Sequence, residues 1–264
     1  MENWIKQIRA IKNSATPIGV ALEAVFKGMG RETWFGDPLI QMILKSDEFN
    51  NTNIYQNQYK TATLIYCGFT LLKEEIKKGF EQHLIIFIFA ALFHNFKHAG
   101  RINKYPFENE KNAIEQMYLF AQKTGLMKLW SKHPWTGLKN MPSWVNSTDA
   151  IEELIFCADF SDVKNISKLY LTNPEDSWRA DLPVQINKLK QIFLEALLLP
   201  NVMSPFFIEE NKKMMSENDI VGVSSFMNRQ IKNFLQNFAI HIYISKASNE
   251  LQISDAIQKN INTL

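Results

Sequence analysis

The sequence predicts an all-α protein, and three observations carry this prediction. Ten Gly and nine Pro among 264 residues leave few helix breakers. Between these breakers, apolar residues recur at intervals of three and four, which is the spacing of one helix face. Strand-like alternation is scarce. Because the chain also lacks internal repeats and Gly/Ser-rich linkers, we expect residues 1–264 to form one single-domain helical bundle.

Helix-capping residues mark the first elements. A helix over about 3–13 comes first. Thr16 is then placed to cap a helix that starts at Pro17 and stops at Gly30, and Asp37 starts the next helix in the same way. The spacing of caps and stops therefore predicts three short helices before the main body of the bundle.

Two longer helices are expected at about 57–78 and 82–98. The second contains LIIFIFAALF (84–93), which is apolar on every side and is followed by Gly100. This run is about half of the roughly 20 residues that a membrane-spanning helix needs. We therefore predict that it is the buried central helix of the bundle.

The second half of the chain continues the helical pattern. ENEKNAIEQMYLFAQKT is amphipathic and stops at Gly125. Ser147 or Thr148 can cap the next helix, which has an acidic first turn and an apolar face that runs to Phe160. Further helices are expected near 180–199, 205–216, 221–246 and 250–262.

Composition excludes several functional classes. The formal net charge of +2 is too small to indicate a nucleic-acid partner. Two cysteines without a CxxC pair indicate neither a disulfide framework nor a structural zinc site. The start, MENWIKQIRAIKNSATP, lacks an apolar signal core, so we expect a cytoplasmic protein without a signal peptide or a membrane span. The aromatic loop residues Trp130, Trp135 and Trp144 are expected to cover the helical core.

Four segments together resemble one known family. They are YQNQYKTATLIYCG (55–68), AALFHNFKHAG (90–100), EELIFCADFSD (152–162) and SSFMNRQIKNFLQNFAIHIY (224–243). In order and context they are similar to the motifs of the class I cyclic-nucleotide phosphodiesterases. This family is a branch of the His-Asp (HD) superfamily of metal-dependent phosphohydrolases. The match spans about 50–245 and implies a helical bundle of the HD phosphodiesterase type.

Three residues keep the family pattern, and a fourth matches its base-binding position. The resemblance places His94 on the histidine of the His-Asp pair and Asp159 on the last metal-ligating aspartate. His98 matches the histidine beside the site, where it would contact substrate. Gln230 matches the glutamine that contacts the purine. The spacing of His94 and His98 would place both on one face of a helix.

Three other positions depart from the family pattern. Asn95 replaces the aspartate that bridges two metals, so an amide without negative charge replaces a strong ligand. Lys60 replaces a metal-ligating histidine, and its ammonium would repel a metal, contact a phosphate or pair with Asp159. Gln56 replaces the histidine that protonates the leaving oxygen, and an amide cannot exchange a proton in this way.

These departures favour a catalytically degenerate phosphodiesterase-like protein, a pseudoenzyme that binds a nucleotide, such as a cyclic nucleotide, or a protein partner without efficient hydrolysis. We expect no cofactor. One alternative is an active hydrolase with a single divalent cation (Mg, Mn, Zn or Fe) held by His94, Asp159 and a weakened Asn95. In that case Glu152, Glu153 or Asp162 could supply a missing ligand. A second alternative is a helical interaction module or effector that reuses the fold.

Overall fold

The structure, a computed structural model, describes residues 2–49, 53–76, 81–101, 103–137, 143–159, 163–172, 182–217 and 219–264. Within these residues the chain is all-α, as predicted, and contains no β-strand. The α-helices are α1 (Glu2–Lys12), α2 (Pro17–Gly28), α3 (Pro38–Lys45), α4 (Gln58–Glu75), α5 (Glu81–His94), α6 (Glu108–Thr124), α7 (Leu126–Trp130), α8 (Trp144–Cys157), α9 (Val163–Thr172), α10 (Leu182–Met203), α11 (Phe207–Glu217), α12 (Ser224–Asn237), α13 (Lys246–Glu250) and α14 (Ile253–Thr263).

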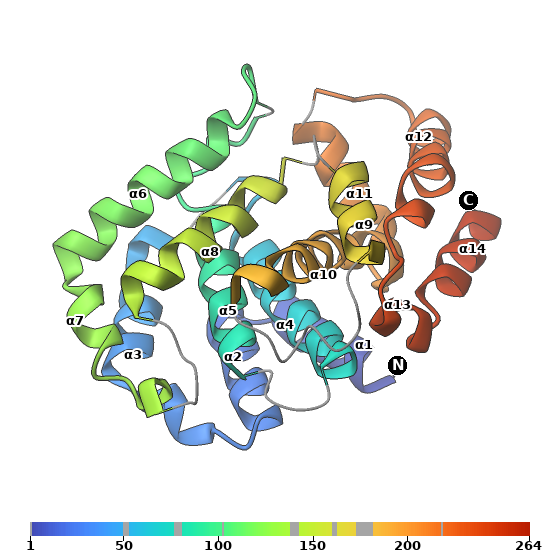
Figure 1. The fold of residues 1–264 in the computed structure, drawn as a ribbon. Helices are drawn as coiled ribbons and strands as arrows, with labels where there is room; N and C mark the ends of the chain where they lie inside the picture. The colour runs from blue at the N-terminus through green and yellow to red at the C-terminus, as the bar shows by residue number, and fades with distance from the viewer. Residues whose placement is uncertain are drawn as a thin grey trace.

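Helix α5 lies at the centre of the fold, which confirms the prediction from its apolar run (Figure 1). Every side chain from His83 to His94 is buried. Helices α4, α8 and α10 contact α5, and α2 packs against α4. Because a helix that is apolar all round is stable only when it is covered on all sides, this packing holds His94, the last residue of α5, inside the protein.

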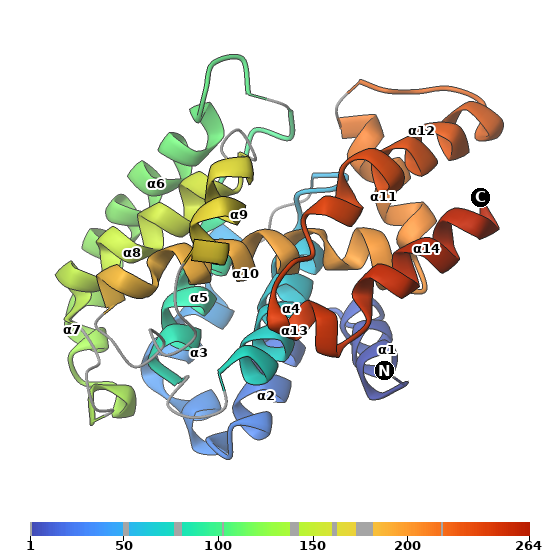
Figure 2. The ribbon, with the colours of Figure 1, turned by 45° about the vertical axis from the view of Figure 1, so that its right-hand side comes forward.

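The remaining helices flank this centre on two sides. Figure 2 shows α6, α7 and α8 on one side and α1, α12 and α14 on the other, so the two ends of the chain share a side. In the described part of the chain, no single helix is long and apolar enough to cross a membrane. The pair Ile186–Met203 and Phe207–Glu217 meets that test only together, and it is bent by 115°.

Helices α4 and α5 approach closely at Gly68. A Cβ placed there would lie 2.0 Å from Cε1 of Phe87, and this buried ring packs against Phe193 with 5.1 Å between ring centroids. We expect Gly68→Ala to lower the free energy of unfolding by about 2 kcal/mol, because overpacking outweighs the gain in helix propensity. Urea denaturation measures the change. Gly36→Ala is the control, since a Cβ at Gly36 meets nothing within 4 Å, and equal losses in both variants would contradict the steric explanation.

The helix predicted over 82–98 ends earlier, at His94. The Phe96 N–H donates to the Phe93 carbonyl, and Lys97 adopts a left-handed φ of 53°. The chain therefore turns sharply, and His98 does not lie one turn above His94 on the same helix. The single-helix geometry that the HxxxH spacing predicted is wrong, because the chain leaves the helical conformation between the two histidines.

The helix predicted over 221–246 is broken as well. Helix α12 stops at Asn237, where Phe238 leaves the helical region with φ −130° and ψ −62°. After a short 3-10 turn, Ser245 caps α13. The buried carboxylate of Glu195 on α10 accepts hydrogen bonds from the Ile244 and Ser245 N–H groups at 3.1 and 2.9 Å. This anchor holds the C-terminal segment against α10 and explains why the chain turns before α13.

The tryptophans cover the core, as the sequence analysis predicted. Trp130, Trp135 and Trp144 are all buried. Their rings pack edge-on against Phe89, with centroid distances of 4.8, 5.7 and 6.2 Å. His133 stacks on Trp135 at 3.4 Å between centroids. The cluster stabilises the end of the bundle near α7 and does not form an exposed stacking wall.

Candidate functional site

One cavity of about 390 Å³ brings together segments that are far apart in the sequence. The turn before α4 and its first residues, the end of α5, the end of α8 and the second half of α10 contribute to its walls. Its lining includes six residues that the motifs single out: Gln56, Lys60, His94, Asn95, His98 and Asp159. The volume lies in the range of pockets that bind small molecules.

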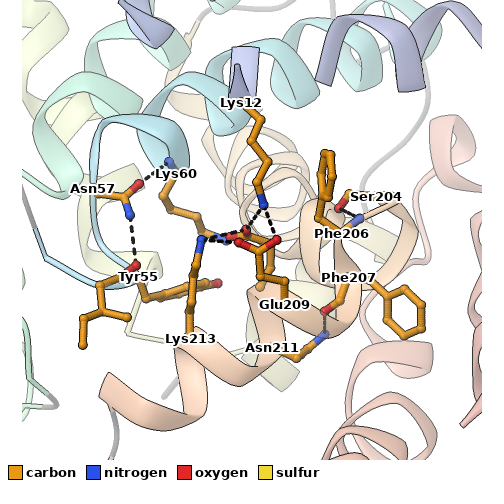
Figure 3. Close-up of polar contacts among 12 residues, drawn as sticks. Lys12, Tyr55, Asn57, Lys60, Ser204, Phe206, Phe207, Glu209, Asn211 and Lys213 are labelled. Atoms are coloured by element: carbon orange, nitrogen blue, oxygen red, sulfur yellow. Dashed lines mark hydrogen bonds and ion pairs between the residues drawn. The ribbon is translucent and has the colours of Figure 1, made fainter. Parts of the chain in front are cut away.

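Lys60 lies in the first turn of α4. The N-cap residue Asn57 accepts a hydrogen bond from the Lys60 N–H at 3.1 Å (Figure 3). The side chain is buried, and its ammonium donates to the Leu197 carbonyl and to Asn201 Oδ1. The Tyr55 ring lies 4.6 Å from Nζ. Burial lowers the pKa of Lys60 from its usual 10.5 to about 8, because the charged form loses its hydration.

His94 ends α5 with its imidazole in a fixed tautomer. Its Nδ1 lies 2.8 Å from the Ala91 carbonyl, so Nδ1 carries the proton and donates it. The side chain is 5% exposed. Burial lowers its pKa to about 3, so the ring is neutral. Its Nε2 is then a lone-pair acceptor, and this atom is buried with no hydrogen-bond partner. A ligand in the cavity can use it.

His98 has the other neutral tautomer, with its proton on Nε2 instead of Nδ1. Its Nδ1 accepts a hydrogen bond from the Gly100 N–H at 3.0 Å, so Nε2 carries the proton. Burial lowers its pKa to about 4. The turn that holds it requires Gly100, which has φ 69° and whose Cβ would lie 2.8 Å from Asn53 Oδ1. His98 is therefore a neutral N–H donor at the wall of the cavity.

Asp159 belongs to a network of neutral donors. The Asn103 amide Nδ2 donates to Asp159 Oδ2 at 2.7 Å and to Glu110 Oε2 at 2.8 Å. The Phe107 N–H also reaches Asp159 Oδ2, at 3.2 Å. The orientation of the Asn103 amide follows from its oxygen, which accepts from the Asn109 N–H. Burial raises the pKa of Glu110, and the nearby Asp159 adds to the effect.

The turn before α4 forms another wall. Glu217 at the end of α11 accepts hydrogen bonds from the Tyr55 and Gln56 N–H groups at 2.8 and 3.2 Å. The Tyr55 hydroxyl donates to Asn201 at 2.8 Å. The side-chain oxygen of Gln56 is buried and has no hydrogen-bond partner. Gln56 thus presents a second acceptor without a donor opposite it.

Helix α11 is itself anchored to the first helix of the chain. The ammonium of Lys12 at the end of α1 lies 2.5 Å from Glu209 Oε2 and 3.3 Å from Glu210 Oε1 (Figure 3). It also lies 4.0 Å from the centroid of the Phe206 ring. Because Glu210 is buried and Lys12 mostly so, these contacts are better shielded from water than a surface ion pair. They hold the helix that ends at Glu217.

Polar residues of this cavity that the sequence analysis did not single out include Arg101, Asn103, Asn109, Glu110 and Glu217. All of these except Glu217 lie in the run after Gly100. Part of that run, ENEKNAIEQM (108–117), resembles the stretch that follows the second family motif, but the resemblance assigned no role to its individual residues. Glu217 carried no signal at all. Its role depends on α11 packing beside the start of α4, which is a contact between distant segments.

The other sequence candidates lie elsewhere. Gln230 is on α12 and does not line the cavity. Glu152 and Glu153 are on α8 and also lie outside the cavity lining, and Glu153 forms an ion pair with Lys190. Asp162 lies outside the described residues. Within the described part of the chain, none of these side chains completes the set around His94.

The residues present do not fit a two-metal centre. Among the described residues, no three His, Cys, Asp or Glu side chains lie close enough to share a metal ion. Asn95 is buried directly after α5 and supplies an amide where two dications would need a carboxylate. Lys60 and Asp159 each bind neutral partners, so the ion pair suggested for them does not form. The charged groups of Lys60 and Asp159 are therefore each held by neutral hydrogen-bond partners and not by one another.

Comparisons with known proteins give no assignment. No protein-family model matches the chain, and no curated protein matches its sequence. What is established is an all-α fold with a polar cavity at the end of its central helix. The relation to the phosphodiesterases depends on the order of the sequence motifs alone.

Proposed function

We propose that this chain is a catalytically degenerate, HD phosphodiesterase-like protein that binds a small ligand in the cavity around His94 and does not hydrolyse it efficiently. The observation that carries this proposal is the gathering of Gln56, Lys60, His94, Asn95, His98 and Asp159 around one cavity. These residues come from three of the motifs that resemble the family. Their common location is what a retained pocket with altered chemistry would produce.

The chemistry of the altered residues argues against efficient turnover. A two-metal phosphodiesterase uses dications about 3.5–4 Å apart to activate a hydroxide. Here the ammonium of Lys60 donates to Leu197 and Asn201, and a cation at that position repels a metal. Gln56 offers no titrating proton for a leaving group. The retained His94 and Asp159 can still contact a ligand, so binding without hydrolysis is the activity that the site supports best.

The proposal is tested by assaying hydrolysis of cyclic AMP, cyclic GMP and bis(p-nitrophenyl) phosphate with added Mg²⁺ or Mn²⁺. We expect no turnover by the natural protein. The triple variant Gln56→His, Lys60→His and Asn95→Asp restores the family pattern and should bind metal, which elemental analysis measures. Hydrolysis by the natural protein that disappears in His94→Ala would contradict the proposal and favour the single-metal hydrolase.

A further inference from the structure

The cavity has unsatisfied hydrogen-bond acceptors. His94 Nε2 is buried without a partner, and its tautomer is fixed by the Nδ1–H bond to the Ala91 carbonyl. Gln56 Oε1 is also buried without a partner. A buried acceptor that stays unpaired is unfavourable by about 1–3 kcal/mol, so each of these two atoms favours a ligand that donates a hydrogen bond.

The cations of the cavity already have partners. The Lys60 ammonium donates to Leu197 and Asn201 and faces the Tyr55 ring. The Arg101 guanidinium makes a two-pronged ion pair with Glu108, at 3.0 and 2.7 Å. Phosphate recognition depends on free ammonium or guanidinium groups, or on backbone N–H groups that point at the anion. Neither cation is arranged to receive a phosphate.

The carboxylates of the cavity have no cation beside them. Asp159 and Glu110 share the neutral amide of Asn103, and Glu217 binds only backbone N–H groups. None of these three forms an ion pair with any described residue. With Arg101 neutralised by Glu108, three carboxylates face one ammonium, that of Lys60. The excess of carboxylates over cations in the cavity therefore favours a positively charged ligand.

We infer that the cavity takes a ligand through a cationic nitrogen group, an amine, amidine or guanidine, and not through a phosphate. Such a group donates several N–H bonds at once, which matches the open acceptors of His94 and Gln56. Its charge complements Glu110, Asp159 and Glu217. The inference deepens the proposed function, because it rests on the same cavity and names the chemical class of its ligand.

The test is isothermal titration calorimetry of the full chain with three probes: agmatine, inorganic phosphate and cyclic AMP. Agmatine should bind with one site per chain. Glu110→Gln keeps an oxygen acceptor for Asn103 and removes the charge, and it should weaken agmatine binding about tenfold. Glu115→Gln, on the exposed face of the same helix, should leave binding unchanged. His94→Phe should also weaken binding, because it removes the Nε2 acceptor.

The outcomes separate this inference from the proposed function. Binding of phosphate or cyclic AMP without binding of agmatine would overturn the inference. The proposed function, binding of a small ligand without efficient hydrolysis, would still stand. Agmatine binding that is the same in Glu110→Gln and in Glu115→Gln would also overturn it, because the probe would then bind elsewhere. Absence of agmatine binding overturns it in every case. The proposed function fails separately, on the hydrolysis assay.

Discussion

Replacing Glu195 with alanine should lower the free energy of unfolding by about 3–5 kcal/mol, because it leaves several buried donors unpaired. This fully buried carboxylate accepts from the Gln191 amide, from the Ile244 and Ser245 N–H groups, and from the Ser245 and Ser248 hydroxyls. Burial raises the pKa of Glu195, while these donors act in the opposite direction. A shortened side chain would release the C-terminal segment from α10.

Urea denaturation at pH 7 measures this loss, and hydrogen exchange at the Ser245 amide locates it. Glu153→Ala is the matched control, since that carboxylate is 53% exposed and forms a surface ion pair with Lys190. Its loss should stay within about 1 kcal/mol. Equal destabilisation by the two variants would show that the hydrogen bonds of Glu195 do not anchor the segment.

Replacing Lys60 with methionine should raise the stability of the protein at pH 7 by roughly 3 kcal/mol. The pKa of Lys60 falls from 10.5 to about 8, so burying its charge is unfavourable by about 1.4 kcal/mol for each unit of that change. Methionine fills a similar volume without charge. Asn201 keeps its bond from the Tyr55 hydroxyl, and the Leu197 carbonyl lies inside α10, so the loss of the ammonium leaves neither acceptor alone.

The pH dependence of this difference has a definite sign. Between about pH 8 and 10.5 the folded protein has lost the Lys60 proton while the unfolded chain still holds it. The unfolded state then binds more protons, so the stability of the natural protein rises with pH in this window. The methionine variant has no such group. Its advantage should therefore be largest below pH 8 and should shrink towards pH 10.5.

Chemical denaturation of both proteins at several pH values between 7 and 10.5 measures the trend. Lys73→Met is the control, because Lys73 is exposed on the same helix. This variant should change stability by less than about 0.5 kcal/mol at every pH. If the Lys60→Met variant is less stable than the natural protein at pH 7, the prediction is wrong. The hydrogen bonds of the ammonium would then stabilise the folded state by more than the loss of its hydration destabilises it.

Local signals in the sequence predicted much of the fold. The apolar run that became α5 and the Pro17 helix were predicted because helix periodicity, capping and burial all depend on near neighbours. The breaks at His94 and Asn237 were not predicted. The turn before α13 depends on contacts between residues far apart in the sequence, since the Ser245 N–H and hydroxyl donate hydrogen bonds to Glu195. The turn after His94 is marked by the left-handed φ of Lys97, which no residue type at that position signals.

The candidate site was predicted in part. Family motifs led to Lys60, His94 and Asp159, which line one cavity. Their partners were not predicted, because sequence alone does not show that Asn103 would bridge Asp159 or that Asn201 would receive Lys60. Those contacts, and the ligand chemistry that follows from them, require the packed positions of helices α4 and α10.

The walls of the cavity are also completed late in the synthesis of the chain. Lys60 is hydrogen-bonded to Leu197 and Asn201, and Tyr55 to Glu217, and these partners lie 137, 141 and 162 residues apart in the sequence. A nascent polypeptide that has emerged only as far as Asp159 contains His94 and Lys60 but lacks the parts of the cavity wall that α10 and α11 supply. Any ligand-binding capacity of this site therefore arises only after α11 has left the ribosome and folded back onto the start of α4.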